Sequence, residues 1–317
     1  MLKKILFGVG AAIVLVIGTL LVTVNVRWKR TFEVPYPALA ATSDSATVAR
    51  GRYLAYGPAH CAACHTSADN QAALRAGEYP ALTGGFVFDI PPGQFRTPNL
   101  TPDSATGIGR RTDGELARMI RHNVRADGRA AVPFMEFNQL ADADVVAILS
   151  FLRSQAPVRH EVPDHDLTML GKAVMAFAVK PLESQAPATS PAATATAERG
   201  EYLVKAVAAC AGCHTERSMA DGHFTGAHLA GGVPMELESP QGGMVTPPNL
   251  TPDPKTGRIA TWSEEDFVAR FRAGERIPGT PMPWIMFGRM SDDDLRAIYR
   301  YLRTIPAVEH EPGAAGK

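Results

Sequence analysis

The sequence predicts an all-α protein in which two tandem domains follow an N-terminal transmembrane helix. Three observations lead to this prediction: an uncharged apolar run near the N-terminus, an internal repeat, and helical spacing of apolar residues in both copies of the repeat. The chain has 317 residues, and a typical domain takes about 150 residues. Because 32 basic side chains balance 32 acidic ones, the excess positive charge of a nucleic-acid-binding protein is missing.

Residues 5–26 make up the apolar run, which contains 22 residues and no charge. A helix of this length spans about 33 Å, which is enough to cross the hydrocarbon layer of a membrane. The alternative is a cleaved signal peptide. The run is longer than the usual apolar core of about 7 to 15 residues, and the small-residue site Ala38–Ala40 lies well beyond it. We therefore predict an uncleaved membrane anchor over residues 1–30.

Four sequence blocks occur twice in the same order, at offsets of 149 and 150 residues. They pair Arg50–Leu54 with Arg199–Leu203, Cys61–Thr66 with Cys210–Thr215, Pro98–Asp103 with Pro248–Asp253, and Ala147–Arg153 with Ala297–Arg303. A solenoid repeat would be far shorter, so the blocks indicate duplicated domains. We assign residues 44–160 to the first domain, residues 161–195 to a connecting segment and linker, and residues 196–310 to the second domain.

Each copy of the repeat predicts the same three helices. The first helix ends near Gly57 in the first copy. The second begins at Thr112, with Glu115 in a capping-box position, and its counterpart begins at Ser263. The last helix has one apolar face, formed by Val145, Ile148, Leu149 and Leu152 in the first copy and by Leu295, Ile298, Tyr299 and Leu302 in the second.

Two further segments connect the copies. Leu167–Val179 predicts a short amphipathic helix that either covers the domain boundary or ends the first domain. Pro181–Ala197 is rich in Ala, Thr, Ser and Pro, which is typical of a linker without fixed structure.

All four cysteines lie in two Cys-x-x-Cys-His pentads, formed by Cys61, Cys64 and His65 and by Cys210, Cys213 and His214. This spacing is that of covalent c-type haem attachment, in which two thiols bind the two vinyl groups and the histidine ligates the iron. A redox dithiol would not require a histidine twice, and a shared zinc site would leave the repeat unexplained. A large apolar cofactor also supplies the buried surface that three short helices lack. We therefore predict two covalently attached c-type haems.

The second axial ligand of each iron is expected to be a methionine. In the first copy we predict Met135, because Met119 falls on the apolar face of a helix. The second copy offers three methionines. Met290 aligns with Leu140 and is expected to be packing, whereas Met282 and Met286 both remain candidates. We prefer Met282, since it lies between two prolines that would hold an extended loop over the haem. The other histidines are expected to be solvated, and His60 beside Cys61 is the exception to watch.

At these residues the chain resembles bacterial dihaem c-type cytochromes, including the cytochrome subunits of membrane-bound quinoprotein and flavin dehydrogenases. The resemblance covers about residues 47–306 and rests on the two pentads, the repeated Pro-Asn-Leu-Thr-Pro-Asp block and Pro-Met-Pro-Trp at 281–284. In this family the methionine before Pro-Trp is an axial ligand, which again indicates Met282. The family's dehydrogenase subunits usually carry three pentads, and the two found here favour a carrier. Asn99, Asn249 and Trp262 are expected either to tune the haem sites or to hold turns.

The resemblance implies two cytochrome c-like domains that transfer single electrons and perform no catalysis of their own. The expected donor is a dehydrogenase or a quinol-oxidising complex, and the expected acceptor is an oxidase or a soluble cytochrome. Three basic residues follow the apolar run and two precede it, which slightly favours a cytoplasmic location of the C-terminal portion. Haem attachment on the exported side outweighs this count and predicts a single-pass protein of the cytoplasmic membrane with periplasmic haem domains. The alternative is a dihaem enzyme, a small-reductant dehydrogenase or a peroxidase, with one open haem and Glu136 as its acid/base group.

Overall fold

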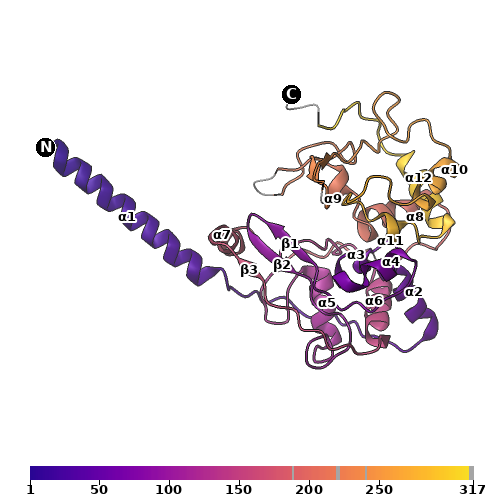
Figure 1. Ribbon diagram of the computed structural model, residues 1–317, viewed down its shortest axis with the longest axis horizontal. Coiled ribbons are helices and arrows are strands. Elements are labelled where there is room, and N and C mark those ends of the chain that lie inside the picture. Colours follow the sequence, from indigo (N-terminus) through magenta and orange to yellow (C-terminus); the bar gives the residue numbers. More distant parts are fainter. Residues whose placement is uncertain (188, 219–221, 240, 314–317) are drawn as a thin grey trace.

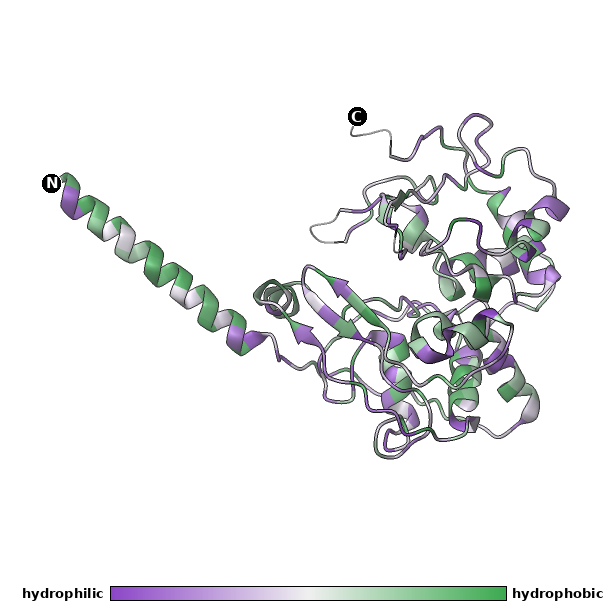
Figure 2. Ribbon diagram, in the orientation of Figure 1, coloured by the Kyte–Doolittle hydropathy of each residue, from purple (hydrophilic) through white to green (hydrophobic). Residues whose placement is uncertain are grey.

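A long apolar helix projects from a body of two lobes (Figure 1). The computed structural model describes residues 1–187, 189–218, 222–239 and 241–313. The long helix, α1 (Leu2–Arg27), has a mean hydropathy of 2.8 in its most apolar window and none of that window is buried. Figure 2 shows the apolar character along most of its length. The predicted N-terminal apolar helix is therefore confirmed, and its length and composition suit a membrane span.

The first lobe contains the helices predicted from the first copy of the repeat, together with two short ones. They are α2 (Ser45–Tyr56), α3 (Cys61–His65), the 3-10 turn η1 (Ala68–Asn70), α4 (Gln71–Arg75), α5 (Asp113–His122) and α6 (Asp142–Ser154). Helix α2 ends before Gly57, as predicted. Thr112 caps α5 and forms the predicted capping box with Glu115.

The second lobe repeats the first helix, the pentad helix and the two longer helices that follow, and it differs in its short elements. It consists of α8 (Ala197–Tyr202), a π-helical stretch η2 (Leu203–Val207), α9 (Ala211–His214), α10 (Glu264–Arg272), α11 (Trp284–Phe287) and α12 (Asp292–Leu302). Ser263 caps α10, with Asp266 completing the capping box. The predicted start of this helix is therefore confirmed.

In each lobe the first helix crosses the last helix at a glycine. A Cβ atom on Gly51 of α2 would lie 1.9 Å from the carbonyl oxygen of Ala147 in α6. A Cβ atom on Gly200 of α8 would lie at the same 1.9 Å from the carbonyl oxygen of Ala297 in α12. Only glycine permits such an approach of two backbones. The sequence repeat thus corresponds to a repeated helix crossing.

The described residues also contain five short strands, which the prediction of an all-α fold did not include. Strands β1 (Val87–Ile90), β2 (Gly93–Arg96) and β3 (Asp166–Leu167) form one antiparallel sheet in that order, and β4 (Met235–Glu236) pairs with β5 (Met244–Val245). Strands of two to four residues are too short for an alternating pattern to be recognised. Strand β3 moreover pairs with a hairpin that lies far away in the sequence.

The segment between the lobes is largely irregular, and backbone hydrogen bonds fix it to the first lobe. After β3 comes α7 (Met169–Phe177), which lies within the predicted helix 167–179. Beyond it, the Leu182 N–H donates to the His122 carbonyl over 3.0 Å, and the Gln185 N–H donates to the Asn138 carbonyl over 2.9 Å. The described part of the linker therefore lies along the first lobe, in contrast to the expected segment without fixed structure.

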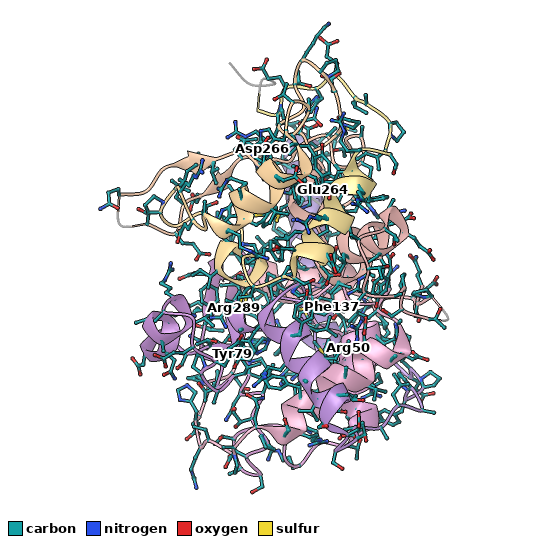
Figure 3. The ribbon with its side chains drawn as sticks, turned by 90° about the vertical axis from the view of Figure 1, so that its right-hand side faces the viewer. Arg50, Tyr79, Phe137, Glu264, Asp266 and Arg289 are labelled. Atoms are coloured by element: carbon teal, nitrogen blue, oxygen red, sulfur yellow. The ribbon has the colours of Figure 1, made fainter. Side chains whose placement is uncertain are left out.

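One apolar core continues through both lobes. It contains buried residues of α2 and α6 together with buried residues of α12 and η2. Figure 3 shows Phe137 and Arg289 at the junction between the lobes. The Arg289 guanidinium lies 4.7 Å from the ring centroid of Tyr79 and donates to the Leu74 carbonyl over 2.7 Å. The junction is thus packed with both apolar and polar contacts.

Candidate functional site

Each Cys-x-x-Cys-His pentad forms a short helix that begins at a sharp turn of the chain. His60 precedes α3 with a φ of 42°, and Ala209 precedes the second pentad with a φ of 47°. Such left-handed conformations are uncommon for residues other than glycine. None of the four cysteines forms a disulfide. The structure therefore places both thiols and the histidine of each pentad on one helical turn.

The two pentad histidines have the same environment. Nδ1 of His65 lies 3.0 Å from the Pro98 carbonyl oxygen, and Nδ1 of His214 lies 2.9 Å from the Pro248 carbonyl oxygen. A hydrogen bond from Nδ1 to a carbonyl fixes the tautomer and orientation of the ring, which leaves Nε2 as the metal ligand. Burial lowers the pKa of His65 to about 4 and also lowers the pKa of His214. Both rings are therefore neutral at pH 7, the form that binds metals.

Two asparagines hold the loops that carry these carbonyl groups. Asn99 follows Pro98, and its Nδ2 donates to the Val158 carbonyl over 2.9 Å. Asn249 follows Pro248, and its Nδ2 donates to the Val308 carbonyl over 2.8 Å. Each asparagine thus fixes the loop whose proline carbonyl accepts the hydrogen bond from the pentad histidine. These contacts support the expectation that both asparagines hold turns, and their effect on a haem site stays a prediction.

The pKa values of the pentad thiols are raised, mainly by burial. Burial raises the pKa of Cys61 and of Cys210 to about 12. Burial and the Glu238 carboxylate raise the pKa of Cys64 to about 11. Redox dithiols use thiols with lowered pKa values, and the shift here has the opposite direction. In the described part of the chain, three or more His, Cys, Asp or Glu side chains nowhere gather into a metal site.

The candidate methionines differ in their surroundings. Met135 is half-buried on the irregular segment before α6, and Met282 is half-buried on the loop before α11. Met286 and Met290 are 1% and 2% exposed and belong to the apolar core. The structure thus places Met282 on a loop, whereas Met286 already packs inside the core.

Buried polar atoms beside the first pentad fit an additional polar group. The hydroxyl groups of Thr66 and Thr83 are buried, and neither finds a hydrogen-bond partner among the described residues. Thr66 follows His65 directly. Buried polar atoms in native proteins normally have a hydrogen-bond partner, which a bound cofactor can supply. Together with the neutral histidine and the two free thiols, they fit a covalently attached haem with polar substituents.

Both pentads lie at the junction between the lobes. The His60 ring, next to Cys61, packs edge-on against Phe287 of the second lobe with ring centroids 5.5 Å apart. In the other direction, the Glu136 carboxylate of the first lobe lies 3.9 Å from the position of a Cβ atom on Gly212, inside the second pentad. Each attachment motif is therefore within contact range of the opposite lobe.

Reciprocal hydrogen bonds join the two lobes. The Tyr53 hydroxyl donates to Asp294 Oδ2 over 2.5 Å, and the Tyr202 hydroxyl donates to Asp144 Oδ2 over 2.7 Å. Both aspartates are buried. The two tyrosines occupy the same position of the repeat, so each lobe gives the other the same bond. This relation resembles the self-complementary contact of a two-fold symmetric dimer.

Two arginines complete this interlobe network. Arg199 pairs with Asp294 over 2.9 Å with both side chains buried, and Arg50 donates to Asp144 over 2.6 Å. The Ser190 hydroxyl, in the linker, accepts hydrogen bonds from both arginines at 3.2 and 3.3 Å. Sequence reasoning missed the network. The signal for it in the sequence is the repeated Arg-Gly-x-Tyr-Leu block, which contains both arginines and both tyrosines.

Known proteins with cytochrome c domains are similar to this chain. Residues 195–302 match the family described as cytochrome c oxidase, cbb3-type, subunit III. The chain is 31% identical to the cytochrome c subunit of a quinone alcohol dehydrogenase from Gluconacetobacter polyoxogenes, over 87% of this chain and 60% of that protein. It is 30% identical to the fructose dehydrogenase cytochrome subunit of Gluconobacter japonicus, over 91% of this chain and 57% of that protein.

In another relative, the match covers a larger share of the relative's own length. The chain is 28% identical to a diheme cytochrome c-type protein of Cereibacter sphaeroides, over 78% of this chain and 83% of that protein. The chain spans about three fifths of the length of the dehydrogenase subunits that it matches. A cytochrome c domain implies haem as its cofactor. The chain is therefore a homologue of dehydrogenase cytochrome c subunits and of a dihaem cytochrome c, and it contains a cytochrome c domain.

Proposed function

We propose that this protein is a membrane-anchored dihaem cytochrome c that carries single electrons, with one haem in each lobe. The observation that carries the proposal is the repeated geometry of the pentads, in which a buried histidine is fixed through Nδ1 to a proline carbonyl at 3.0 Å in one lobe and 2.9 Å in the other. When bound, haem iron supplies a one-electron couple between Fe(II) and Fe(III). The two tandem cytochrome c domains are then residues 44–160 and 196–310.

The roles of the side chains follow from their chemistry. The four pentad cysteines would attach the haems, and His65 and His214 would each give Nε2 to an iron. Met135 and Met282 would give the second axial ligands through sulfur, which raises the potential relative to two histidines. The half-buried loop position of Met282 supports it over Met286, which packs in the core.

The junction between the lobes supports electron exchange within the molecule. His60 and Phe287 contact each other across it. The Tyr53 and Tyr202 hydroxyl groups each donate a hydrogen bond to one buried aspartate of the opposite lobe. A rigid junction keeps the separation of the two haem sites constant. An electron accepted at one site would then pass to the other across this junction.

The setting in the cell follows from α1 and from the relatives. Helix α1 would cross the cytoplasmic membrane once, with both lobes in the periplasm, where c-type haem is attached. The dehydrogenase cytochrome subunits among the relatives favour a dehydrogenase as donor. A quinol-oxidising complex is the other donor that this chemistry suits. The acceptor would be an oxidase or a soluble cytochrome.

Carbon monoxide binding separates the carrier from an enzyme with an open haem. The full chain is purified in detergent and reduced, and its optical spectrum is recorded with and without the gas. If both irons have two protein ligands, the spectrum stays unchanged. A shift in about half of the haem absorbance would contradict the carrier and favour the small-reductant dehydrogenase or peroxidase.

A further inference from the structure

We infer that α7 is a second membrane contact, which lies on the bilayer surface with one apolar face among the lipid headgroups. The inference rests on the proposed crossing of the membrane by α1. The surface concerned consists of the last turn of α1, Trp28, and the exposed side of α7, and it is called the α1–α7 surface below. None of the contacts that define it involves the pentads or the junction between the lobes.

Helix α7 is fixed beside the end of α1 (Figure 1). The Arg27 guanidinium lies 5.6 Å from the ring centroid of Phe177, and the Lys172 ammonium lies 5.6 Å from the ring centroid of Trp28. Arg30 also donates to the Val179 carbonyl over 2.8 Å. These contacts hold α7 at the level where α1 leaves the apolar layer.

One side of α7 exposes large apolar residues. Leu170 and Phe177 are 54% and 44% exposed, and Met169 is 47% exposed. Leu170, Ala173 and Phe177 follow at intervals of three and four residues, so they share one face of the helix. An exposed apolar stripe of this kind indicates a binding surface.

The opposite side of α7 is locked to the first lobe. A Cβ atom on Gly171 would lie 1.9 Å from the Pro92 carbonyl oxygen, between β1 and β2. Thr168 caps the helix and also donates to the same carbonyl over 3.1 Å. The helix therefore cannot turn its apolar side inward without breaking these contacts. Its exposed face keeps one direction relative to the lobe.

Charge identifies lipid as the partner of this face. Residues 24–32 and 167–182 contain five basic residues, Arg27, Lys29, Arg30, Lys172 and Lys180, and no acidic residue. Basic side chains around an apolar stripe, with a tryptophan beside them, are typical of helices that lie in the membrane interface and bind anionic lipids. Helix α7 also contacts the end of α1, whose own exposed residues are mostly apolar. A contact at α7 would fix the tilt of both lobes relative to the membrane.

Photo-crosslinking of the full chain in lipid vesicles tests the inference. Leu170 is replaced by p-benzoylphenylalanine, and the protein is reconstituted in vesicles of phosphatidylethanolamine and phosphatidylglycerol. Matched chains carry the same residue at Val14 in α1 and at Glu265, an exposed residue of α10, which lies on the side of the body away from α1 (Figure 1). We expect lipid adducts by mass spectrometry at positions 14 and 170, with less than about one tenth of that yield at 265.

The outcomes separate this inference from the proposed anchor. Adducts at position 14 but none at 170 would overturn the inference and leave the anchor intact. A crosslink from position 170 to a second copy of the chain would also overturn it, because the stripe would then be an oligomer interface. An absence of adducts at position 14 would contradict the membrane crossing itself. Equal haem content in the three variants shows that the substitutions have left the lobes folded.

Discussion

At the scale of single residues, the site depends on peptide carbonyls that orient two buried histidines. The sequence motif alone predicts His65 and His214 as ligands, because the pentad spacing has few other uses. It does not reveal that the Pro98 and Pro248 carbonyls accept hydrogen bonds from their Nδ1–H groups, nor that Asn99 and Asn249 hold the loops carrying those prolines. Such contacts join residues more than thirty positions apart, which periodicity and motif spacing do not describe.

Replacing Asn249 by alanine should destabilise the second lobe. The substitution removes the bond to the Val308 carbonyl and leaves buried polar groups without a partner. We expect a loss of about 1 to 3 kcal/mol in the free energy of unfolding, measured by denaturant titration. Asn138 is the matched control, because its Nδ2 also donates to a carbonyl, that of Glu183 over 2.9 Å, at an exposed site. Equal effects at the two positions would contradict the structural role of Asn249.

Methionine substitutions distinguish the two candidate ligands of the second haem. Met282→Ala should open one iron, so that carbon monoxide shifts about half of the haem absorbance in the reduced protein. Met286→Ala should instead create a core cavity and cost about 2 to 5 kcal/mol of stability without any response to the gas, because Met286 is 1% exposed within the core. The reverse pair of results would transfer the ligand assignment to Met286.

At the scale of helices, local sequence signals predicted the ends of elements well and the short elements poorly. The capping boxes at Thr112 and Ser263 mark the starts of α5 and α10, because the cap is a contact among four successive residues. Strand β3 forms only because the connecting segment passes beside β2. The four residues of α11 likewise depend on tertiary packing. Elements of this kind are decided by long-range contacts.

The two helix crossings give a prediction at this scale. Gly51→Ala and Gly200→Ala should each push a helix pair apart, because the added methyl group would lie 1.9 Å from a carbonyl oxygen. Overpacking of this kind costs about 1 to 3 kcal/mol, seen as a lower Tm by circular dichroism. Gly10→Ala in α1 is the control, since nothing lies within 4 Å of its Cβ position. Unchanged Tm values for Gly51→Ala and Gly200→Ala would show that the crossings are looser than described.

At the scale of the whole molecule, the two lobes are joined by a network that is itself duplicated. The repeat could be read directly from the sequence, because its blocks recur at offsets of 149 and 150 residues. The sequence does not show that the tyrosine of each copy bonds to the aspartate of the other lobe. A repeat gives no information about how its copies pack. The paired bonds Tyr53–Asp294 and Tyr202–Asp144 supply that information.

Removal of one interlobe hydroxyl should separate the unfolding of the lobes. Tyr53→Phe leaves the buried Asp294 without one of its donors and weakens the junction by about 1.5 to 3 kcal/mol. Differential scanning calorimetry should then resolve two transitions where the unmodified chain shows one. Tyr299→Phe is the control, because that hydroxyl donates to the Trp262 carbonyl over 2.6 Å within the second lobe. If Tyr299→Phe also gave two transitions, the effect would not belong to the junction.

Intact mass of the purified chain tests the central claim, that each lobe holds one covalently attached haem. The unmodified protein should carry the mass of two haems. A chain with Cys210→Ala and Cys213→Ala should carry one haem, and so should a chain with Cys61→Ala and Cys64→Ala. A single haem on the unmodified protein, or an unchanged mass increment after either double substitution, would contradict the account of two equivalent sites.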